Sequence, residues 1–474
     1  METISKSPRT SIDRFSSLPD HVAHQVLSYV SIEDISRLSL VSRRLRELCI
    51  SVPYLIFDVI PYRNDAVKRA RLINYLDRLL FLRKGMDTQR LYIRWCLQNG
   101  LVDEEYRILS WLQSAVICNI ELLDLDIILV KEVAEFSLPP SVVSCRSLRF
   151  LRVNLRGGTL NIPSPITTSG FCSLHTMSVQ SVRINDSFGE WISTYCKFLK
   201  ELCLEDIRGT KSIVITSSSL EILKILSPHD LFTLQVSAEM LGRMALRWRF
   251  DSPANRVLQL SAPKLKSMFW EGNILYFRRV ETFMHLNTAG IFFRPSSDIS
   301  ASTSENLVRV LCSVCNIKVL ALHDKCIRVL YEHGCLPTLF TYLLTLHIFT
   351  AGISKDFVPG MESLLKGMPN LRCLSISGKF MQCHANAKRV NGETENAGTW
   401  GLKNLMFMHS LKYVTIELIS DGKNELELIK YLLKHANNLR KMTVFCASPL
   451  QSDVSREINL YDKASDAELN FHKI

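Results

Sequence analysis

"NLRCLSI", residues 370–376, is a short strand pattern with apolar side chains at Leu371, Leu374 and Ile376. Positions two apart in a strand point to the same face, so Leu374 and Ile376 predict one buried face. The same spacing, with apolar residues at positions n, n+3 and n+5, recurs along the chain. Nine further copies occupy residues 147–153, 173–179, 198–204, 219–225, 264–270, 317–322, 343–348, 410–416 and 438–444.

The spacing of these copies predicts a repeat array. Successive early copies lie 26, 25 and 21 residues apart, and later ones 26 and 28. These periods are typical of leucine-rich repeats, in which each unit buries its face on its neighbours. The alternative is a set of unrelated buried strands in a globular α/β protein, but ten copies in one register favour the array. Helices are expected between strands on the convex side, at 188–199 and at 425–439, the latter with Glu425 on its polar face.

Polar stretches divide the array from its C-terminal part. Residues 294–304 and 382–400 contain few apolar side chains and predict loops. Residues 401–446 then supply two strand patterns joined by a helix, which predicts a terminal unit that closes the array. Residues 447–474 predict a polar tail that leaves the fold.

The N-terminal stretch "SLPDHVAHQVLSYVSIEDISRLSLVSRRLREL", residues 17–48, predicts three short helices. Pro19 suits a first helical turn, and Ser31 with Asp34 is a capping-box signal. A unit of about 40 residues rarely buries enough apolar surface to be stable alone. We therefore expect its apolar stripes to pack on the rest of the chain or on another protein.

Composition is that of a folded protein with a basic surface. Among 474 residues there are 57 basic and 46 acidic side chains, a formal net charge of +11, spread along the sequence. This spread favours a generally basic surface over a nucleic-acid site. The first 15 residues show no apolar signal region, and the 14 cysteines predict buried thiols in a reducing compartment. Residues 334–354 lack charged side chains but contain Pro337 and a strand pattern, which favours core packing over a membrane helix.

No stretch carries a recognisable catalytic motif. Gly-rich phosphate loops, nucleophile elbows and H-E-x-x-H helices do not occur. The nearest metal-like set lacks a second C-x-x-C pair, so buried thiols are expected in place of a zinc site; its members are Cys312, Cys315, Cys326 and Cys335, with His323 and His333 nearby. Trp248 and Phe277, each beside arginines, are expected in the core and not as base-stacking platforms. We therefore expect no active site, no metal and no cofactor.

Several landmarks in order resemble one known family. Leu18-Pro19-Asp20 and "LVSRR" (40–44) are similar to an F-box, and residues 51–58, 104–116 and 138–153 match later landmarks. The segment 409–444 is similar to an FBD unit. The chain thus resembles plant F-box/leucine-rich-repeat proteins with a C-terminal FBD domain. Two positions depart from the F-box pattern, since Ser31 stands where proline is usual and Leu45 where tryptophan is usual.

The resemblance implies an α/β fold and a domain order. A three-helix F-box is followed by a leucine-rich-repeat solenoid and a C-terminal FBD-type cap. The expected segments are an F-box at 11–55, repeats at 56–381, a polar loop at 382–400, an FBD-like unit at 401–446 and a tail at 447–474.

The resemblance also implies a function without catalysis. In that family the F-box binds the Skp-type adaptor of an SCF ubiquitin ligase, and through it the cullin and RING subunits, while the repeats present a protein substrate. Nucleic acid and membrane are not expected partners, and the expected location is the nucleus, the cytoplasm or both. The residues that the resemblance assigns to adaptor contact are Leu18, Pro19, Val26, Leu27, Val30, Ile35, Leu38, Val41 and Leu45. About a third of them are expected to pack the helices together instead.

Other functions stay open at this point. Ser31 and Leu45 motivate a binding scaffold that no longer engages a ligase, and the basic charge motivates a nucleic-acid binder. The substrate is not identified by the sequence, and a small-molecule co-ligand also stays open. Residues between the apolar strand positions are expected on the concave face and are mixed in charge, which favours a protein surface; examples are Arg149, Arg152, His175, Ser178, Lys200, Glu201, Cys203, Arg372, Cys373 and Ser375.

Overall fold

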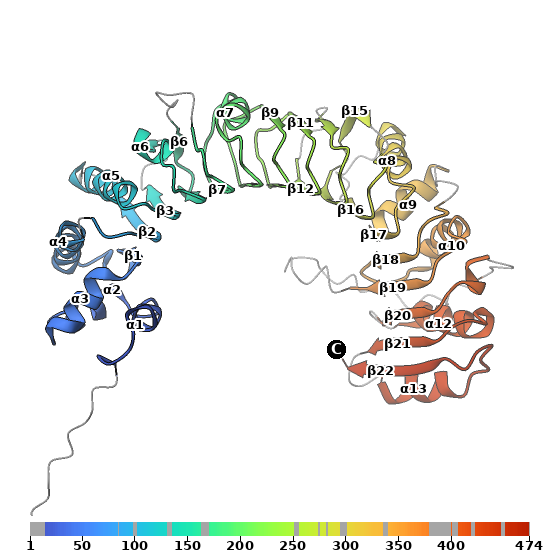
Figure 1. The fold of residues 1–474 in the computed structure, drawn as a ribbon. Coiled ribbons are helices and arrows are strands. Elements are labelled where there is room, and N and C mark those ends of the chain that lie inside the picture. Colours follow the sequence, from blue (N-terminus) through green and yellow to red (C-terminus); the bar gives the residue numbers. More distant parts are fainter. Residues whose placement is uncertain are drawn as a thin grey trace, which may run out of the picture. The chain divides into compact units, whose positions relative to one another are not determined.

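The structure is a computed structural model of a helical N-terminus followed by stacked parallel strands (Figure 1). The residues it describes are 15–83, 85–97, 102–129, 135–162, 170–250, 256–273, 275–280, 283–293, 301–334, 340–378, 400, 406–418, 422–446 and 451–473. The chain divides into two compact units, Met1–Thr210 (unit 1) and Lys211–Ile474 (unit 2).

Unit 1 begins with three helices and continues as strands that alternate with helices. The elements are α1 (Asp20–Leu27), α2 (Ile32–Leu38), α3 (Arg43–Ser51), β1 (Tyr54–Asp58), η1 (Ile60–Tyr62), α4 (Ala66–Leu82), β2 (Arg90–Leu97), α5 (Val102–Ile117), β3 (Leu122–Leu129), β4 (Glu135–Ser137), α6 (Pro140–Val143), β5 (Phe150–Asn154), β6 (Thr159–Asn161), β7 (Thr176–Gln180), α7 (Phe188–Tyr195) and β8 (Glu201–Glu205). In Figure 1, α4 and α5 cover one side of β1, β2 and β3.

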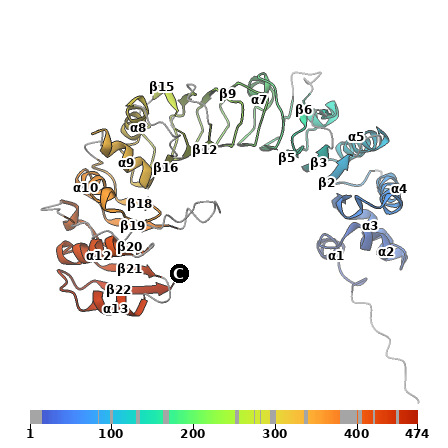
Figure 2. The same cartoon turned by 180° about the vertical axis from the view of Figure 1, so that it is seen from behind.

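Unit 2 starts with strands alone and regains helices further along the chain. Its first part comprises β9 (Ser212–Ser217), β10 (Ile222–Leu226), β11 (Thr233–Ala238), β12 (Arg243–Trp248), β13 (Val257–Ser261), β14 (Ser267–Gly272), β15 (Tyr276–Val280) and β16 (Thr288–Phe293). Its second part comprises α8 (Ala301–Ser313), β17 (Val319–His323), α9 (Asp324–Glu332), β18 (Thr345–Phe349), η2 (Lys355–Phe357), α10 (Val358–Lys366), β19 (Cys373–Ser377), η3 (Met406–His409), β20 (Tyr413–Glu417), α12 (Lys423–His435), β21 (Lys441–Cys446), α13 (Gln451–Asn459) and β22 (Glu468–Lys473). Figure 2 shows these helices on one side of the strands β17–β22.

The strands pair in parallel and in register, as a repeat array requires. Leu374 of β19 lies opposite Leu346 of β18 and Val414 of β20, so apolar side chains stack in a continuous buried row. The ten predicted strand patterns are confirmed, because each contains a strand of the main sheet: β5, β7, β8, β10, β14, β17, β18, β19, β20 and β21. The expected helices are also present as α7 and α12.

The backbone turns sharply after several strands. Arg156, Ser181, Asp206 and Ser227 follow β5, β7, β8 and β10, and each has a positive φ, between 47° and 52°. Few non-glycine residues adopt this left-handed conformation. The same turn therefore recurs from one repeat to the next, at a position where the amino-acid type varies.

Strands replace helices opposite β10, β12 and β14. There a second sheet in the order β15-β13-β11-β9 is present, in a part of the array for which the sequence predicted no specific helix. Leu234 and Val236 of β11 are buried and alternate with Thr233 and Gln235, which gives the strand period. Leu231, Leu234 and Val236 also have the n, n+3, n+5 spacing, but this copy lies between two copies of the main sheet and was not recognised as a second strand of the repeat.

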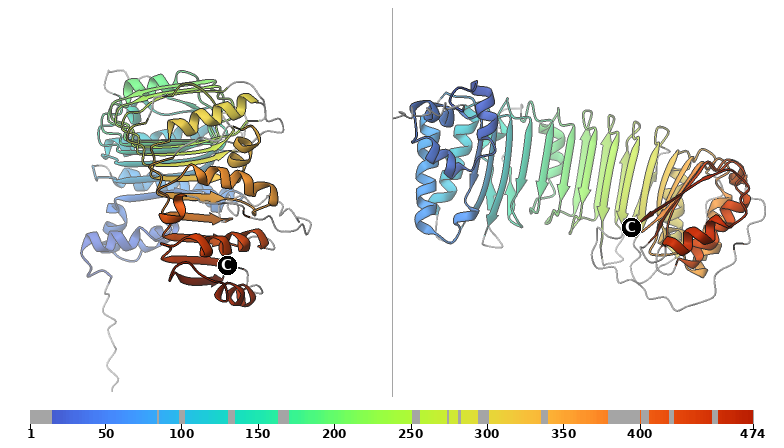
Figure 3. Two further views of the ribbon diagram at one scale, coloured as in Figure 1. Left: turned by 90° about the vertical axis from the view of Figure 1, so that its right-hand side faces the viewer. Right: turned by 90° about the horizontal axis from the view of Figure 1, so that it is seen from below.

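The predicted polar tail is wrong, because residues after 446 continue the array. β22 pairs in parallel with β21, from Lys441 opposite Glu468 to Cys446 opposite Lys473. Ile458 of α13 is fully buried, and Glu457 forms an ion pair of 2.7 Å with Lys430 of α12. Figure 3 (left) shows α12 and α13 along the last strands. The sequence did not predict this repeat, because residues 447–474 contain few apolar side chains and α13 buries few large ones.

Two further expectations at the polar segments need correction. Residues 294–304 are not wholly a loop, since α8 already begins at Ala301. Glu425 is buried, not exposed, and accepts a hydrogen bond of 2.9 Å from the Ile353 N–H, which ties α12 to the repeat that begins with β18. The predicted loop 382–400 lies outside the described residues except for Trp400.

The uncharged segment 334–354 contains a core strand. β18 lies in its centre, with Leu346 and Ile348 buried. Within the described residues, no helix is both long and apolar enough to cross a membrane.

Candidate functional site

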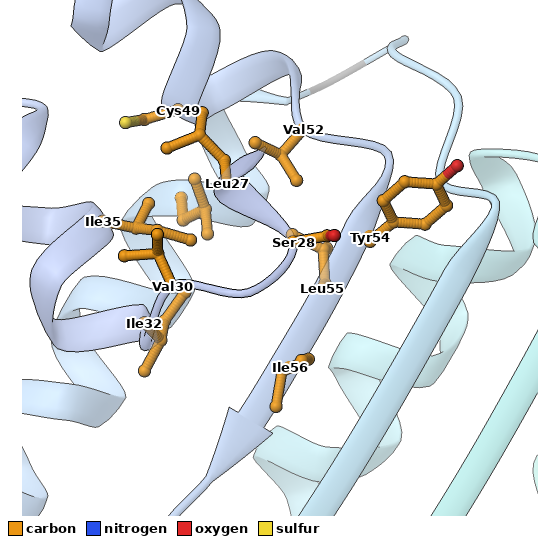
Figure 4. Close-up of a pocket in the computed structure, with 11 residues that line it drawn as sticks. Leu27, Ser28, Val30, Ile32, Ile35, Cys49, Val52, Tyr54, Leu55 and Ile56 are labelled. Carbon is orange, nitrogen blue, oxygen red and sulfur yellow. The ribbon is translucent and has the colours of Figure 1, made fainter. Parts of the chain in front are cut away.

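The N-terminal helices share a core with the first repeat. Ala23, Leu27, Ile35, Leu48 and Cys49 are buried together. The core continues into the first repeat at Val52, Tyr54 and Leu55 (Figure 4). The expectation that the helices pack against the rest of the chain is therefore met for this part of their apolar surface.

Arg83 fixes this junction from the end of α4. Its side chain is fully buried, and Nη1 donates to the carbonyl oxygens of Ile50 and Val52 at the end of α3. Nη2 donates to the Asp87 carbonyl oxygen at 3.0 Å and to the Thr88 hydroxyl at 3.2 Å. Burial lowers the pKa of Arg83 to about 10, so the guanidinium stays protonated at neutral pH. Arg83 was not predicted from the sequence, because nothing in its local pattern distinguishes it from a surface arginine.

Local capping positions the helices. The Ser31 hydroxyl accepts the Asp34 N–H at 3.2 Å and donates to the Asp34 carboxylate at 2.7 Å, which confirms the predicted capping signal. The Ser42 hydroxyl accepts the Leu45 N–H at 3.1 Å. Pro19 is the residue just before α1 and not in its first turn. Ser31 and Leu45, the two departures from the expected pattern, are thus both accommodated by the helices.

An ion pair links the starts of α1 and α3. Arg44 donates to the Asp20 carboxylate, and this hydrogen bond lowers the pKa of Asp20. Both side chains are largely exposed, so the pair orients the helices more than it stabilises them.

The structure separates the nine predicted contact residues into three groups. Leu27, Ile35 and Leu45 are buried, with 1%, 7% and 7% exposure. These three pack the helices together and present little surface, which is the role expected for about a third of the nine. Adaptor contact by the others stays a prediction. Leu18, Val30 and Leu38 are half-buried, and all three pack against the core. Pro19, Val26 and Val41 are exposed.

Two exposed apolar residues were missed. Tyr29 follows α1 and Leu40 follows α2, with 86% and 77% exposure. Helical periodicity selects the stripe that faces the core, so it passes over residues just beyond a helix end. We call Pro19, Val26, Tyr29, Leu40 and Val41 the exposed apolar set.

The open face of the sheet, opposite the helices, carries charged ladders in unit 1. Arg94 lies 3.8 Å from Asp58 and 3.5 Å from Asp126 on the neighbouring strands. Asp126 also pairs with Arg156 at 3.0 Å. These pairs largely neutralise one another, so this part of the face is polar without a strong net charge.

A second ladder runs beside the first. Arg152 donates to Asp124 at 3.3 Å and to Gln180 at 2.8 Å. Gln180 in turn donates to Glu205 at 3.2 Å. Burial raises the pKa of Asp124 despite the charge and hydrogen bond of Arg152.

The residues that were expected on the concave face lie in two rows, one within the strands and one just before them. Arg152, Ser178 and Cys203 lie directly opposite one another on β5, β7 and β8. Arg149, His175 and Lys200 precede the same strands, joined by backbone hydrogen bonds of 2.8 Å. Glu201 begins β8, while Arg372, Cys373 and Ser375 lie in or just before β19 of unit 2.

A metal-ligating group of three or more side chains does not occur among the described residues. Cys326 is buried and donates to the Ile291 carbonyl oxygen at 3.5 Å, which explains it as a core thiol. Cys312 is exposed, Cys315 is half-buried, and Cys335 lies outside the described residues. Trp248 is fully buried, as expected; the side chain of Phe277 is not among those described.

Comparison with known families covers the three parts of the chain. The F-box domain model matches residues 15–57, which contain α1, α2 and α3. The model for the leucine-rich repeats of FBD-associated F-box protein At5g56370 matches residues 108–339, and the FBD model matches 406–444. The chain belongs to the F-box/LRR family with a C-terminal FBD domain.

Relatives align along almost the whole of this F-box/LRR chain. At4g03220 of Arabidopsis thaliana, named as an F-box/FBD/LRR-repeat protein, is 24% identical over 97% of this chain and 96% of its own length. F-box/LRR-repeat protein 13 and F-box/FBD/LRR-repeat protein At1g78750, from the same plant, are each 25% identical. They cover 91% and 96% of this chain, and 89% and 95% of their own lengths.

Proposed function

We propose that this protein is the substrate-recognition subunit of an SCF-type ubiquitin ligase. F-box proteins generally bind a Skp-type adaptor, and the adaptor in turn binds the cullin and RING subunits. The single observation that supports this role most is the exposed apolar set on the F-box. These large apolar side chains remain in solvent although the neighbouring stripes are buried against the first repeat.

The proposed role is to position a substrate without catalysis. Other subunits transfer ubiquitin, and a receptor raises the effective concentration of a substrate lysine beside the charged carrier. The repeats offer the open sheet face for the protein substrate. We propose a nuclear or cytoplasmic location, which a fluorescent fusion in plant cells tests.

Co-purification with the adaptor and cullin tests this function. Leu40→Asp with Val41→Asp replaces two exposed side chains, so the F-box core stays intact. We expect at least a tenfold loss of adaptor affinity. Truncating a side chain that becomes buried in an interface typically costs about 1.4 kcal/mol or more of binding free energy. Leu460→Asp alters an equally exposed leucine of unit 2 and is the matched control.

The result separates the receptor from the competing scaffold. If the parent protein binds neither adaptor nor cullin, the scaffold is correct and the receptor role is not. If the parent binds but the double variant binds equally well, the adaptor contacts a different part of the F-box.

A further inference from the structure

From β14 to β19 the open face of unit 2 has a central row without acidic or strongly basic side chains. The buried carboxylate of Glu271 lies beside this row, two residues after Phe269 on β14, and is neutralised by its ion pair with Arg247 at 2.9 Å. Phe269, Gly290, Ala321, His347 and Ser375 lie opposite one another in register and form the middle row of this face. None of these five positions is acidic or strongly basic. Burial lowers the pKa of His347, so its imidazole is neutral at pH 7. The row therefore differs from the charged ladders of unit 1.

Aromatic rings cover the first part of this row. The Phe269 and Phe292 rings lie 5.1 Å apart, and the Phe292 and Phe349 rings lie 5.4 Å apart. A Cβ atom at Gly290 would lie 3.0 Å from the Phe292 ring and 3.2 Å from the Phe269 ring. A larger side chain here would therefore press on both rings, which lie over the backbone. Side chains are shortest at Gly290 and Ala321, between Phe269 on one side and His347 on the other.

We call this region the aromatic floor: Phe269, Gly290, Phe292, Ala321, His347 and Phe349. Phe269 and His347 are three strand spacings apart, about 14 Å. That width fits one or two apolar side chains of a bound segment. Phe269, Ala321, His347 and Phe349 are each partly exposed, so the floor offers apolar surface to a ligand.

A line of basic residues borders the floor at the start of the strands. The residue just before each strand donates its N–H to its counterpart in the preceding repeat. Lys318 donates to Asn287, Arg372 to Leu344 and Lys412 to Arg372, at 2.8–3.0 Å. Lys266 holds the same position before β14. We call Lys266, Lys318, Arg372 and Lys412 the basic rim.

We propose that this face binds an extended protein segment that places an uncharged aliphatic or aromatic side chain on the aromatic floor and acidic side chains on the basic rim. This inference rests on the proposed receptor function and gives the chemical class of its substrate segment. Ala321 lies three residues after Lys318, about 10 Å along the strand. An extended chain covers that distance in about three residues, so neighbouring acidic and apolar side chains reach both surfaces.

The physical basis combines two contributions. The floor contributes burial of apolar area and ring contacts, which supply affinity. The rim contributes long-range attraction to carboxylates, which raises the association rate and orients the segment. A strongly basic segment would be repelled by the rim, and a segment lacking apolar side chains would leave the floor uncovered.

Peptide selection on the full chain, co-purified with the Skp adaptor, tests the proposal. A random 12-residue phage library is the probe, and enriched peptides are then labelled and titrated by fluorescence anisotropy. We expect peptides with an apolar residue within three positions of acidic residues. We expect Ala321→Trp and Lys318→Glu each to weaken their binding at least tenfold, and added salt to weaken binding to the parent.

Two controls keep the test decisive. Lys434→Glu reverses the charge of an exposed lysine on α12, away from the open face, and should leave affinity within twofold. Gly290→Leu displaces the two rings and should also weaken binding. If it lowers the melting temperature, Ala321→Trp, at a partly exposed position, decides the question.

Other outcomes overturn the proposal. Enriched peptides that are basic, or that bind Ala321→Trp as well as the parent, exclude this site. Competition by a 20-nucleotide single-stranded RNA that is itself lost in Lys318→Glu assigns the face to nucleic acid instead. If no peptide is enriched while the adaptor remains bound, the proposal is wrong but the receptor function stands. If the parent fails to bind the adaptor, the receptor function is wrong, and the same peptide selection on the full chain without the adaptor decides this site.

Discussion

Arg83 joins the F-box to the first repeat through its buried hydrogen bonds. Arg83→Met should destabilise this junction by about 2–4 kcal/mol, because the carbonyl oxygens of Ile50, Val52 and Asp87 lose their donor in a buried site. Hydrogen exchange at the end of α3, with urea unfolding, measures the effect. Arg78→Met, an exposed arginine on the same helix, is the control. If the two variants are equally stable, water must donate the hydrogen bonds to these carbonyl oxygens in place of the Arg83 guanidinium.

His24 makes the F-box sensitive to moderate acid. Burial lowers the pKa of His24 below its usual value near 6.5, and Nε2 lies 2.9 Å from the Ser51 hydroxyl. Below pH 6.5 the unfolded chain therefore binds a proton more readily than the folded one, and stability falls as the pH drops toward the folded pKa.

We expect faster hydrogen exchange in α1 and α3 at pH 5.5 than at pH 7.5, after correction for the intrinsic rate. His24→Gln should remove most of this difference. His21→Gln, at an exposed position of the same helix, should not. A pH response that survives His24→Gln would assign it to another group.

At the scale of the elements, the final helix and strand protect the end of the array. Ile458 is fully buried, whereas Leu460, two residues later, is 81% exposed. Ile458→Asp should remove at least about 3 kcal/mol of local stability, since it loses an apolar side chain and buries a charge. We expect loss of exchange protection in α13 and β22, with aggregation through the uncovered β21 edge.

Leu460→Asp provides the matched comparison for the same chemical change. It should leave exchange protection and solubility as in the parent protein. If Ile458→Asp behaves like Leu460→Asp, α13 does not stabilise the end of the array.

The sequence predicted most strands of the main sheet, but it predicted the second sheet, the final repeat and the exposed F-box residues poorly. Apolar spacing identified β19 and its counterparts because buried strand positions repeat at fixed intervals. It missed β9, where Thr210 stands at the first apolar position, and β22, which buries little. It also missed β11, although Leu231, Leu234 and Val236 have the expected spacing. In the F-box, spacing found the core residue Leu27 but not the exposed Tyr29 and Leu40. Apolar spacing in one sequence predicts which side chains are buried. It does not tell whether the rest of the chain or a partner protein buries them, because that depends on how the helices and strands pack.

At the scale of the whole molecule, the F-box lies in unit 1 and the aromatic floor in unit 2. A chain ending at Thr210 keeps the F-box, its junction with β1 and the strands to β8. We expect it to bind the adaptor within about threefold of the full chain, and to be less stable because its last strand lacks a covering repeat. Titration of purified adaptor measures this. A tenfold loss would show that adaptor binding requires the second unit.

The in-register strands give the open face the regularity of a grid. Neighbouring points lie about 4.8 Å apart across the strands and about 6.7 Å apart along them. Side chains at these points face away from the packed interior, so exchanging an exposed one changes little buried volume. Gly290 and Phe292 are exceptions, because they pack against neighbouring rings. Each contact of a ligand can then be altered singly, while the scaffold beneath it stays the same. Proteins with this sheet can therefore acquire new ligands through a few substitutions without having to fold differently.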